Sequence, residues 1–117
     1  MKVSRGDVVL VDYPFSDRTG SKVRPALVVQ ADSLNRRIED TILAAISRSV
    51  HRASVTQLFI DLATPEGAGT GLRQNSMVQC ENLLTYDTRL VLTKIGSLPI
   101  SLMQRVDECL KAALELK

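Results

Sequence analysis

The sequence contains few of the residues on which several classes of binding and catalytic site depend. It has no tryptophan, aromatic residues make up 3% of the chain, and there is one histidine. So few aromatic rings disfavour a base-stacking platform and an aromatic groove for proline-rich peptides. The single histidine, His51, cannot supply both the acid and the base of a two-histidine ribonuclease within one chain.

Cysteines, metal-ligand patterns and long apolar runs are scarce as well. Cys80 and Cys109 are the two cysteines of the chain, and with one histidine they do not make a usual four-ligand zinc site. No paired carboxylates stand at a diagnostic spacing, and the glycines of residues 64–71 do not match a phosphate-binding loop. No apolar run is long enough to span a membrane, and residues 1–7 have no signal-peptide core. We therefore expect a cytoplasmic protein with reduced thiols, no metal, no cofactor and no membrane contact.

The residues that are present fit a small globular protein with a basic segment. The chain has 117 residues, of which 44% are hydrophobic and 24% charged, values that are ordinary for one domain, so we expect a single domain over residues 1–117. The net charge is only +2, but residues 18–52 contain seven basic and three acidic side chains. Such a segment in a nearly neutral protein favours a polyanion as partner.

Short apolar runs separated by turn residues predict a mainly β structure. We expect strands at residues 7–13, 26–30, 41–46, 55–62, 76–80 and 89–95. Residues 31–40 read as a connection or a short helical turn, and residues 64–71 as a plain turn. From Leu102 to Ala113 the apolar residues recur at helical spacing, which predicts a C-terminal helix starting near Pro99. This order indicates an α+β, mainly β fold: a small barrel or curved antiparallel sheet with a helix packed on it.

Arg24 is the clearest candidate for chemistry. Pro25 fixes its own backbone and biases Arg24 toward an extended conformation, which we expect to lie at the mouth of the strand that follows. A guanidinium held in this way can donate two parallel hydrogen bonds to a phosphate. Taken alone, such an arginine is more often part of a structural salt bridge. Ser47 taken alone reads as a strand-terminating serine, and no pattern marks it as the nucleophile of a hydrolase.

Three segments, taken in order, resemble the successive motifs of the MazF/PemK toxins. They are residues 5–8 (Arg-Gly-Asp-Val), residues 23–30 (Val-Arg-Pro-Ala-Leu-Val-Val-Gln) and residues 44–47 (Ala-Ala-Ile-Ser). The similarity continues through residues 79–82 and into the C-terminal helix, so it covers nearly the whole chain.

The resemblance implies an SH3-like β-barrel or curved antiparallel sheet of the MazF/PemK/CcdB-like toxin fold, assembled as a homodimer. It implies a growth-regulating toxin of a type II toxin–antitoxin system, a metal-independent endoribonuclease (mRNA interferase) that cuts single-stranded RNA at short sequences. A cognate antitoxin protein would silence it, and DNA would be involved only indirectly, through the antitoxin complex.

By this resemblance Arg24 and Ser47 occupy the catalytic positions. Ser47 stands where threonine is common and keeps the hydroxyl, whereas Thr19 stands where some members carry a glutamate. The 2′-OH of the RNA would be the nucleophile, with Arg24 and Ser47 stabilising the charged phosphorane. The sequence assigns no residue to accept the 2′-OH proton. Further RNA contacts are expected at Phe15, Ser16, Lys22, Arg48, Ser49, His51, Arg52 and Asn82.

Two other functions are compatible with this fold. One is a gyrase-poisoning toxin, which typically ends in a tail bearing tryptophan, and the absence of tryptophan weighs against it. The other is a non-catalytic SH3-like module that binds RNA or protein, for which aromatic residues are in short supply. The ribonuclease therefore ranks first and the binding module second. No motif indicates the cleavage sequence, the class of RNA or the identity of the antitoxin.

Overall fold

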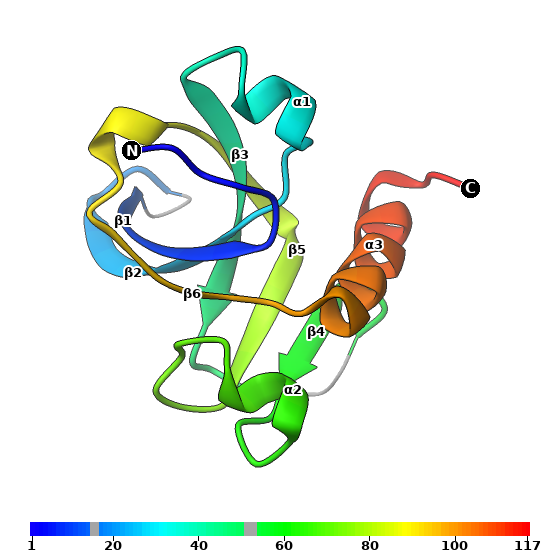
Figure 1. The fold of residues 1–117 in the computed structure, drawn as a ribbon. Coiled ribbons are helices and arrows are strands. Elements are labelled where there is room, and N and C mark those ends of the chain that lie inside the picture. Colours follow the sequence, from blue (N-terminus) through cyan, green and yellow to red (C-terminus); the bar gives the residue numbers. More distant parts are fainter. Residues whose placement is uncertain (15–16, 51–53) are drawn as a thin grey trace.

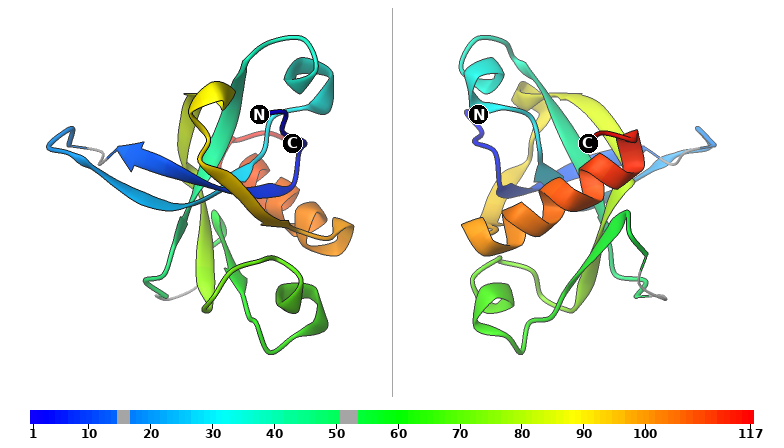
Figure 2. Two further views of the ribbon diagram at one scale, coloured as in Figure 1. Left: turned by 60° about the vertical axis from the view of Figure 1, so that its left-hand side comes forward. Right: turned by 90° about the vertical axis from the view of Figure 1, so that its right-hand side faces the viewer.

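A curled antiparallel sheet dominates the computed structural model, which describes residues 1–14, 17–50 and 54–117. Over these residues six strands lie in the order β4-β5-β3-β2-β1-β6. Their bounds are β1 Asp7–Pro14, β2 Ser21–Val28, β3 Asp40–Ser47, β4 Gln57–Ile60, β5 Ser76–Asp87 and β6 Thr93–Ser97. The sheet bends into a half-barrel, and the hairpin of β1 and β2 projects from its body (Figures 1 and 2). The expected class, a curved antiparallel sheet with a C-terminal helix, is confirmed.

Helix α3, Ile100–Leu114, covers one face of the sheet and packs against β5 and β4 (Figure 2). Its buried side chains are Leu102, Met103, Val106 and Cys109, and all but Met103 belong to the apolar stripe that predicted the helix. The remaining helical elements are single turns: α1 Asp32–Asn35, α2 Pro65–Ala68 and a 3₁₀ turn at Thr88–Leu90. None of the helices in the described ranges is long and apolar enough to cross a membrane.

The apolar strands bury side chains on both faces of the sheet. In β1, Val8 belongs to the cluster between the sheet and α3, whereas Val9 belongs to the cluster on the opposite face. Leu27 and Val28 of β2 divide between the same two clusters. Because successive side chains of a strand point to opposite faces, covering both faces allows continuous runs of apolar residues to be buried.

The start of β2 corrects one expectation. The strand begins at Ser21 rather than at residue 26, because residues 21–27 pair with β1 in register from Pro14↔Ser21 to Val8↔Leu27. Arg24 therefore lies inside a strand, opposite Val11, and not at its mouth. Polar residues can extend a strand in this way when a neighbouring strand supplies the backbone hydrogen bonds.

Other boundaries also differ from expectation. Strand β5 continues past residue 80 to Asp87, because Leu83–Asp87 pair with the first half of β3 beyond a bulge at residues 44/45. The strand expected at residues 89–95 starts only at Thr93, after the 3₁₀ turn. The run expected to be a plain turn at residues 64–71 contains α2, with Thr64 as its cap: the Thr64 hydroxyl accepts a hydrogen bond from Gly67 N.

Candidate functional site

A groove opens where strands β2 and β3 separate. The two strands pair from Val28↔Leu43 to Ala26↔Ala45 and no further. The next residue of β2 is Pro25, which has no N–H with which to extend the ladder. Continuing the same register would place Arg24 opposite Ser47, each two residues beyond the last pair and on the same face of the sheet.

The groove has a volume of about 1040 Å³, and its charged lining residues, among those that the structure describes, are all positive. Its walls are residues 22–25 of β2, residues 46–49 at the end of β3, and residues 71–74 of the loop before β5. The cationic lining residues are Lys22, Arg24, Arg48 and Arg73. Among the lining residues that the structure describes there is no aspartate or glutamate. Four cations with no carboxylate between them favour an anionic ligand.

Arg24 is held at the groove by Tyr13 of the neighbouring strand. The guanidinium carbon of Arg24 lies 5.5 Å from the centroid of the Tyr13 ring. The hairpin register makes the two residues diagonal neighbours, since Val11 pairs with Arg24 and Tyr13 with Lys22. Diagonal neighbours on one face of a sheet are within reach when one side chain is aromatic. The cation–π contact therefore restricts the side chain of Arg24.

Tyr13 is itself fixed by Asn82 on strand β5. The Tyr13 side chain is 2% exposed, and its hydroxyl donates to the carbonyl oxygen of Asn82 at 3.1 Å and to Asn82 Oδ1 at 3.3 Å. Burial raises the pKa of Tyr13 to about 12, partly offset by the charge of Arg24. The phenol thus stays neutral, and remains a donor to Asn82, through the physiological pH range.

Ser47 presents its hydroxyl at the end of β3. The Ser47 oxygen accepts a hydrogen bond from the backbone N–H of Ser49 at 3.1 Å. Because a hydroxyl is both acceptor and donor, this contact leaves the Ser47 proton available to a ligand in the groove. The bond from the N–H two residues later closes a short turn, and serine commonly forms such a turn where a strand ends.

The structure brings together several of the residues that the sequence analysis singled out. Lys22, Arg24, Ser47, Arg48 and Ser49 all line the groove. Asn82 does not line it, because its side chain is engaged with Tyr13 and, through Nδ2, with Gln79 Oε1 at 3.4 Å. The RNA contacts expected at Phe15, Ser16, His51 and Arg52 lie outside the described residues.

Two residues of the site, Tyr13 and Arg73, were not predicted from the sequence. Tyr13 ends an apolar strand and has no motif around it, so only the hairpin register shows that its ring meets Arg24. Arg73 follows a glycine-rich run that matches no phosphate-binding pattern. The sequence marks Arg73 only as a basic residue in a loop next to a strand. Such residues are too common for this feature to identify a site.

The only carboxylate in the described part of the β1–β2 loop does not reach the groove. Asp17 Oδ1 accepts hydrogen bonds from the backbone N–H of Thr19 at 3.0 Å and from its hydroxyl at 2.7 Å. These bonds lower the pKa of Asp17, the backbone bond contributing most. Asp17 is therefore ionised near neutral pH and occupied within its own turn. No group of three potential metal-ligating side chains occurs in the part of the chain that the structure describes.

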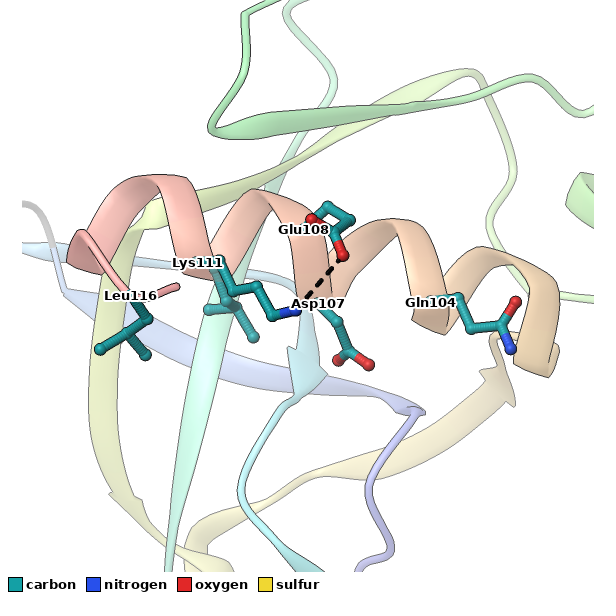
Figure 3. Close-up of a pocket in the computed structure, with 6 residues that line it drawn as sticks. Gln104, Asp107, Glu108, Lys111 and Leu116 are labelled. Atoms are coloured by element: carbon teal, nitrogen blue, oxygen red, sulfur yellow. Dashed lines mark hydrogen bonds and ion pairs between the residues drawn. The ribbon is translucent and has the colours of Figure 1, made fainter.

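A second depression lies on the outer surface of α3, with a volume of about 500 Å³ (Figure 3). Its lining includes Gln104, Asp107 and Leu116, and Lys111 Nζ lies 3.4 Å from Glu108 Oε1. Both signs of charge are present and already paired on this solvated helix face. The depression thus lacks the uncompensated charge of the groove, and we place the candidate site in the groove.

The half-barrel and its cation-lined groove, which holds an arginine and a hydroxyl, form a candidate site for an anionic ligand, and the comparisons show the family. Residues 4–114 match the model of the family described as PemK-like, MazF-like toxin of type II toxin-antitoxin system, and the chain belongs to this family. It is 35% identical to Endoribonuclease EndoA of Bacillus subtilis over 99% of the chain and 97% of that protein. It is 30% identical to Endoribonuclease MazF6 of Mycobacterium tuberculosis over 99% of the chain and all of that protein.

Solved structures share the fold. An endoribonuclease in complex with its cognate antitoxin from Mycobacterial species aligns with a TM-score of 0.79 at 20% identity, covering 98% of this chain and 97% of that one. The Mycobacterium tuberculosis toxin MazF-mt6 aligns with a TM-score of 0.75 at 25% identity, covering 97% and 99%. The half-barrel with its terminal helix is therefore the fold of the MazF toxins.

Proposed function

We propose that this protein is the toxin of a type II toxin–antitoxin pair and acts as a metal-independent endoribonuclease on single-stranded RNA. One observation carries the proposal: Arg24 and Ser47, which would face each other if the β2–β3 register continued, both line a groove whose charged residues, among those described, are all cationic. The 35% identity to a protein named as an endoribonuclease supports it, because the alignment spans 99% of the chain.

The lining of the groove suits a single strand better than a duplex or a compact anion. Besides the four cations, the groove has an aliphatic lining: Leu10, Val23, Pro25, Ile46, Leu72 and Ile95. Phosphates of an unpaired strand can bind the cations while its exposed bases contact this apolar surface. A duplex would keep its bases stacked and away from the aliphatic side chains.

The proposed reaction uses the nucleophile that RNA carries. The oxygen of the 2′-OH forms a bond to the adjacent phosphorus, and the bond from phosphorus to the 5′ oxygen breaks. The products are a 2′,3′-cyclic phosphate and a 5′-hydroxyl. Arg24 donates two hydrogen bonds to the phosphate oxygens, on which negative charge develops, and Ser47 donates a third. The proton of the 2′-OH passes to water, and the leaving 5′ oxygen takes up a proton from the Arg24 guanidinium, which water then reprotonates. Arg24 is thus chiefly the electrostatic stabiliser and also the proton donor to the leaving oxygen.

The test is cleavage of a long single-stranded RNA by purified protein in excess EDTA. We expect a limited set of fragments, with ends that identify a short recognition sequence and carry the cyclic phosphate and the 5′-hydroxyl. The Arg24→Ala variant, purified in parallel, controls for contaminating ribonucleases. If wild type binds the RNA and leaves it intact under all conditions, the protein is a binding module and the proposal is wrong.

A cognate antitoxin is the proposed protein partner. A solved endoribonuclease of this fold is described in complex with its cognate antitoxin, and MazE–MazF complexes of Deinococcus radiodurans share the fold. A cation-lined groove would accept an acidic segment of such a partner as readily as RNA. We expect the antitoxin and RNA to compete, so adding RNA should weaken antitoxin binding to the wild-type protein.

We further propose that the chain is one domain, assembles as a homodimer and acts in the cytoplasm, where RNA is present. Large apolar side chains at the surface, among them Leu90 at 61% and Leu92 at 57% exposed, are consistent with a second copy covering part of it. Sedimentation at micromolar concentration should give about twice the chain mass. A mass near 12.9 kDa would contradict the dimer.

A further inference from the structure

Arg73 is a groove cation from a segment unconnected to the Arg24–Ser47 pair. It lies in the loop between α2 and β5, is exposed, and lines the groove with Arg24 and Arg48. Within the described ranges it forms no ion pair and no side-chain hydrogen bond. Its guanidinium is therefore not committed to holding the fold together.

The loop that carries Arg73 is anchored at both ends. Before it, Thr70 is fully buried and its hydroxyl donates to the carbonyl of Gly67 at 2.9 Å. After it, Asn75 Oδ1 accepts a hydrogen bond from Leu62 N at 2.8 Å. A long side chain on an anchored loop loses less freedom on binding than one on a mobile loop.

The loop is also pressed directly against strand β6. Gly71 has a φ of 81°, and a Cβ atom at this position would lie 2.0 Å from the carbonyl oxygen of Ile95. A Cβ atom at Gly96 would lie 2.2 Å from the carbonyl oxygen of Thr70. Two glycines thus permit a backbone crossing that side chains would forbid. This crossing fixes the backbone at the start of the loop that brings Arg73 to the groove.

We propose that Arg73 binds a phosphate of the RNA strand other than the one held by Arg24 and Ser47. This inference rests on the proposed function, and it assigns the loop of residues 71–74 as a second phosphate-binding segment. An arginine fork matches a phosphate without reading sequence, so the contact aligns the strand in the groove and leaves base selection to other residues. Because the contact is the same before and during the reaction, it lowers KM and leaves kcat unchanged.

The first measurement is the salt dependence of binding to a short 2′-O-methyl RNA, followed by fluorescence anisotropy, with strand integrity checked on a gel. For single strands each phosphate contact contributes about 0.7 to the slope of log K against log salt. We expect Arg73→Ala and Arg73→Gln both to reduce the slope by about this amount and to weaken binding roughly tenfold at low salt. Arg36→Ala, which removes the same charge from the C-terminal cap of α1 outside the groove, should leave the slope at the wild-type value.

The second measurement is cleavage kinetics on RNA. Arg73→Ala should raise KM about tenfold and keep kcat within about twofold. A salt slope and KM equal to those of Arg36→Ala would overturn the assignment, and so would a fall in kcat with unchanged KM. Wild-type protein that binds the strand with the expected Arg73 dependence but never cleaves RNA would overturn the ribonuclease proposal and leave this inference intact.

Discussion

The guanidinium of Arg24 rests on the ring of Tyr13, with 5.5 Å between the guanidinium carbon and the ring centroid. Tyr13 is in turn tied to Asn82 by its hydroxyl. The side chain proposed to contact the scissile phosphate is thus positioned by a buried residue of β1, and that residue is positioned by β5. Such support restricts the candidate catalytic arginine to few orientations before RNA binds.

Substitution of Tyr13 tests whether it is a positioning residue. Tyr13→Phe keeps the ring under Arg24 but loses the hydroxyl and its hydrogen bonds to the two Asn82 oxygens. This loss should lower stability by about 0.5–1.5 kcal/mol and leave activity nearly unchanged. Tyr13→Leu removes the cation–π contact, worth about 0.5–2 kcal/mol, and should lower kcat roughly 2- to 30-fold. Thermal unfolding and kcat measured on both variants separate the two effects. Equal kcat for Phe and Leu would mean that the ring does not position Arg24.

Replacement of Arg24 tests the candidate catalytic arginine. Arg24→Ala removes one preorganised charged donor and should cost about 2.7–4 kcal/mol of barrier, or roughly 10²- to 10³-fold in kcat. Arg24→Lys should be nearly as slow, because a point charge cannot make the two parallel hydrogen bonds. Circular dichroism should show both variants folded, and Arg36→Ala serves as the charge-matched control. Cleavage by Arg24→Ala within a few-fold of wild type would exclude Arg24 from the chemistry.

Two substitutions test Ser47, because threonine is common at this position in the toxins that the chain resembles. Ser47→Ala loses a donor to a charged oxygen, which should cost about 1.5–3 kcal/mol and roughly ten- to hundredfold in kcat. Ser47→Thr keeps the hydroxyl and the bond from Ser49 N–H, so it should retain activity. Ser33→Ala, an exposed hydroxyl of α1, controls for loss of a serine elsewhere. Equal rates for the Ala and Thr variants would remove Ser47 from the site.

The regular elements of the fold were predictable because both faces of the sheet are covered. Val8 to Val11 form a strongly apolar run, and Leu102 to Ala113 follow helical periodicity. The second half of β5 was not predicted, because polar Glu81 and Asn82 interrupt the apolar run that ends at Cys80. Pairing of Leu83–Asp87 with β3 carries the strand past this interruption, and this pairing is a tertiary effect that local sequence does not show.

The site was predictable only in part. Resemblance singled out Arg24 and Ser47, but what brings them together is the pairing of Ala26 with Ala45 and the end of that ladder at Pro25. The sequence does not specify which strands pair, so neither Tyr13 nor Arg73 could be joined to Arg24 from the sequence alone. Both depend on register or on the close crossing of two segments far apart in the chain.

The titration of Tyr13 should depend on the folded state. Its pKa rises from the ordinary 10.0 to about 12, chiefly through burial, so the folded protein holds the phenol proton more tightly than the unfolded chain. This group should leave the free energy of unfolding unchanged below pH 10 and lower it as the pH rises from 10 to about 12. Tyrosinate absorbance of wild type minus Tyr13→Phe gives the titration directly. A difference curve centred at pH 10 would show that Tyr13 is not buried in solution.

The nucleophile is tested by removing one oxygen atom from the substrate. In a strand with a single 2′-deoxy nucleotide immediately before the scissile phosphate, the proposed attacking group is absent while every phosphate remains. This strand should bind with the affinity of the parent RNA, through Lys22, Arg24, Arg48 and Arg73, and should resist cleavage at that bond. A deoxy nucleotide placed several positions away serves as the matched control and should be cut normally, in EDTA as well as in magnesium. Cleavage of the first strand at the same bond and a comparable rate would mean that water or a side chain attacks the phosphorus, and the proposed mechanism would be wrong.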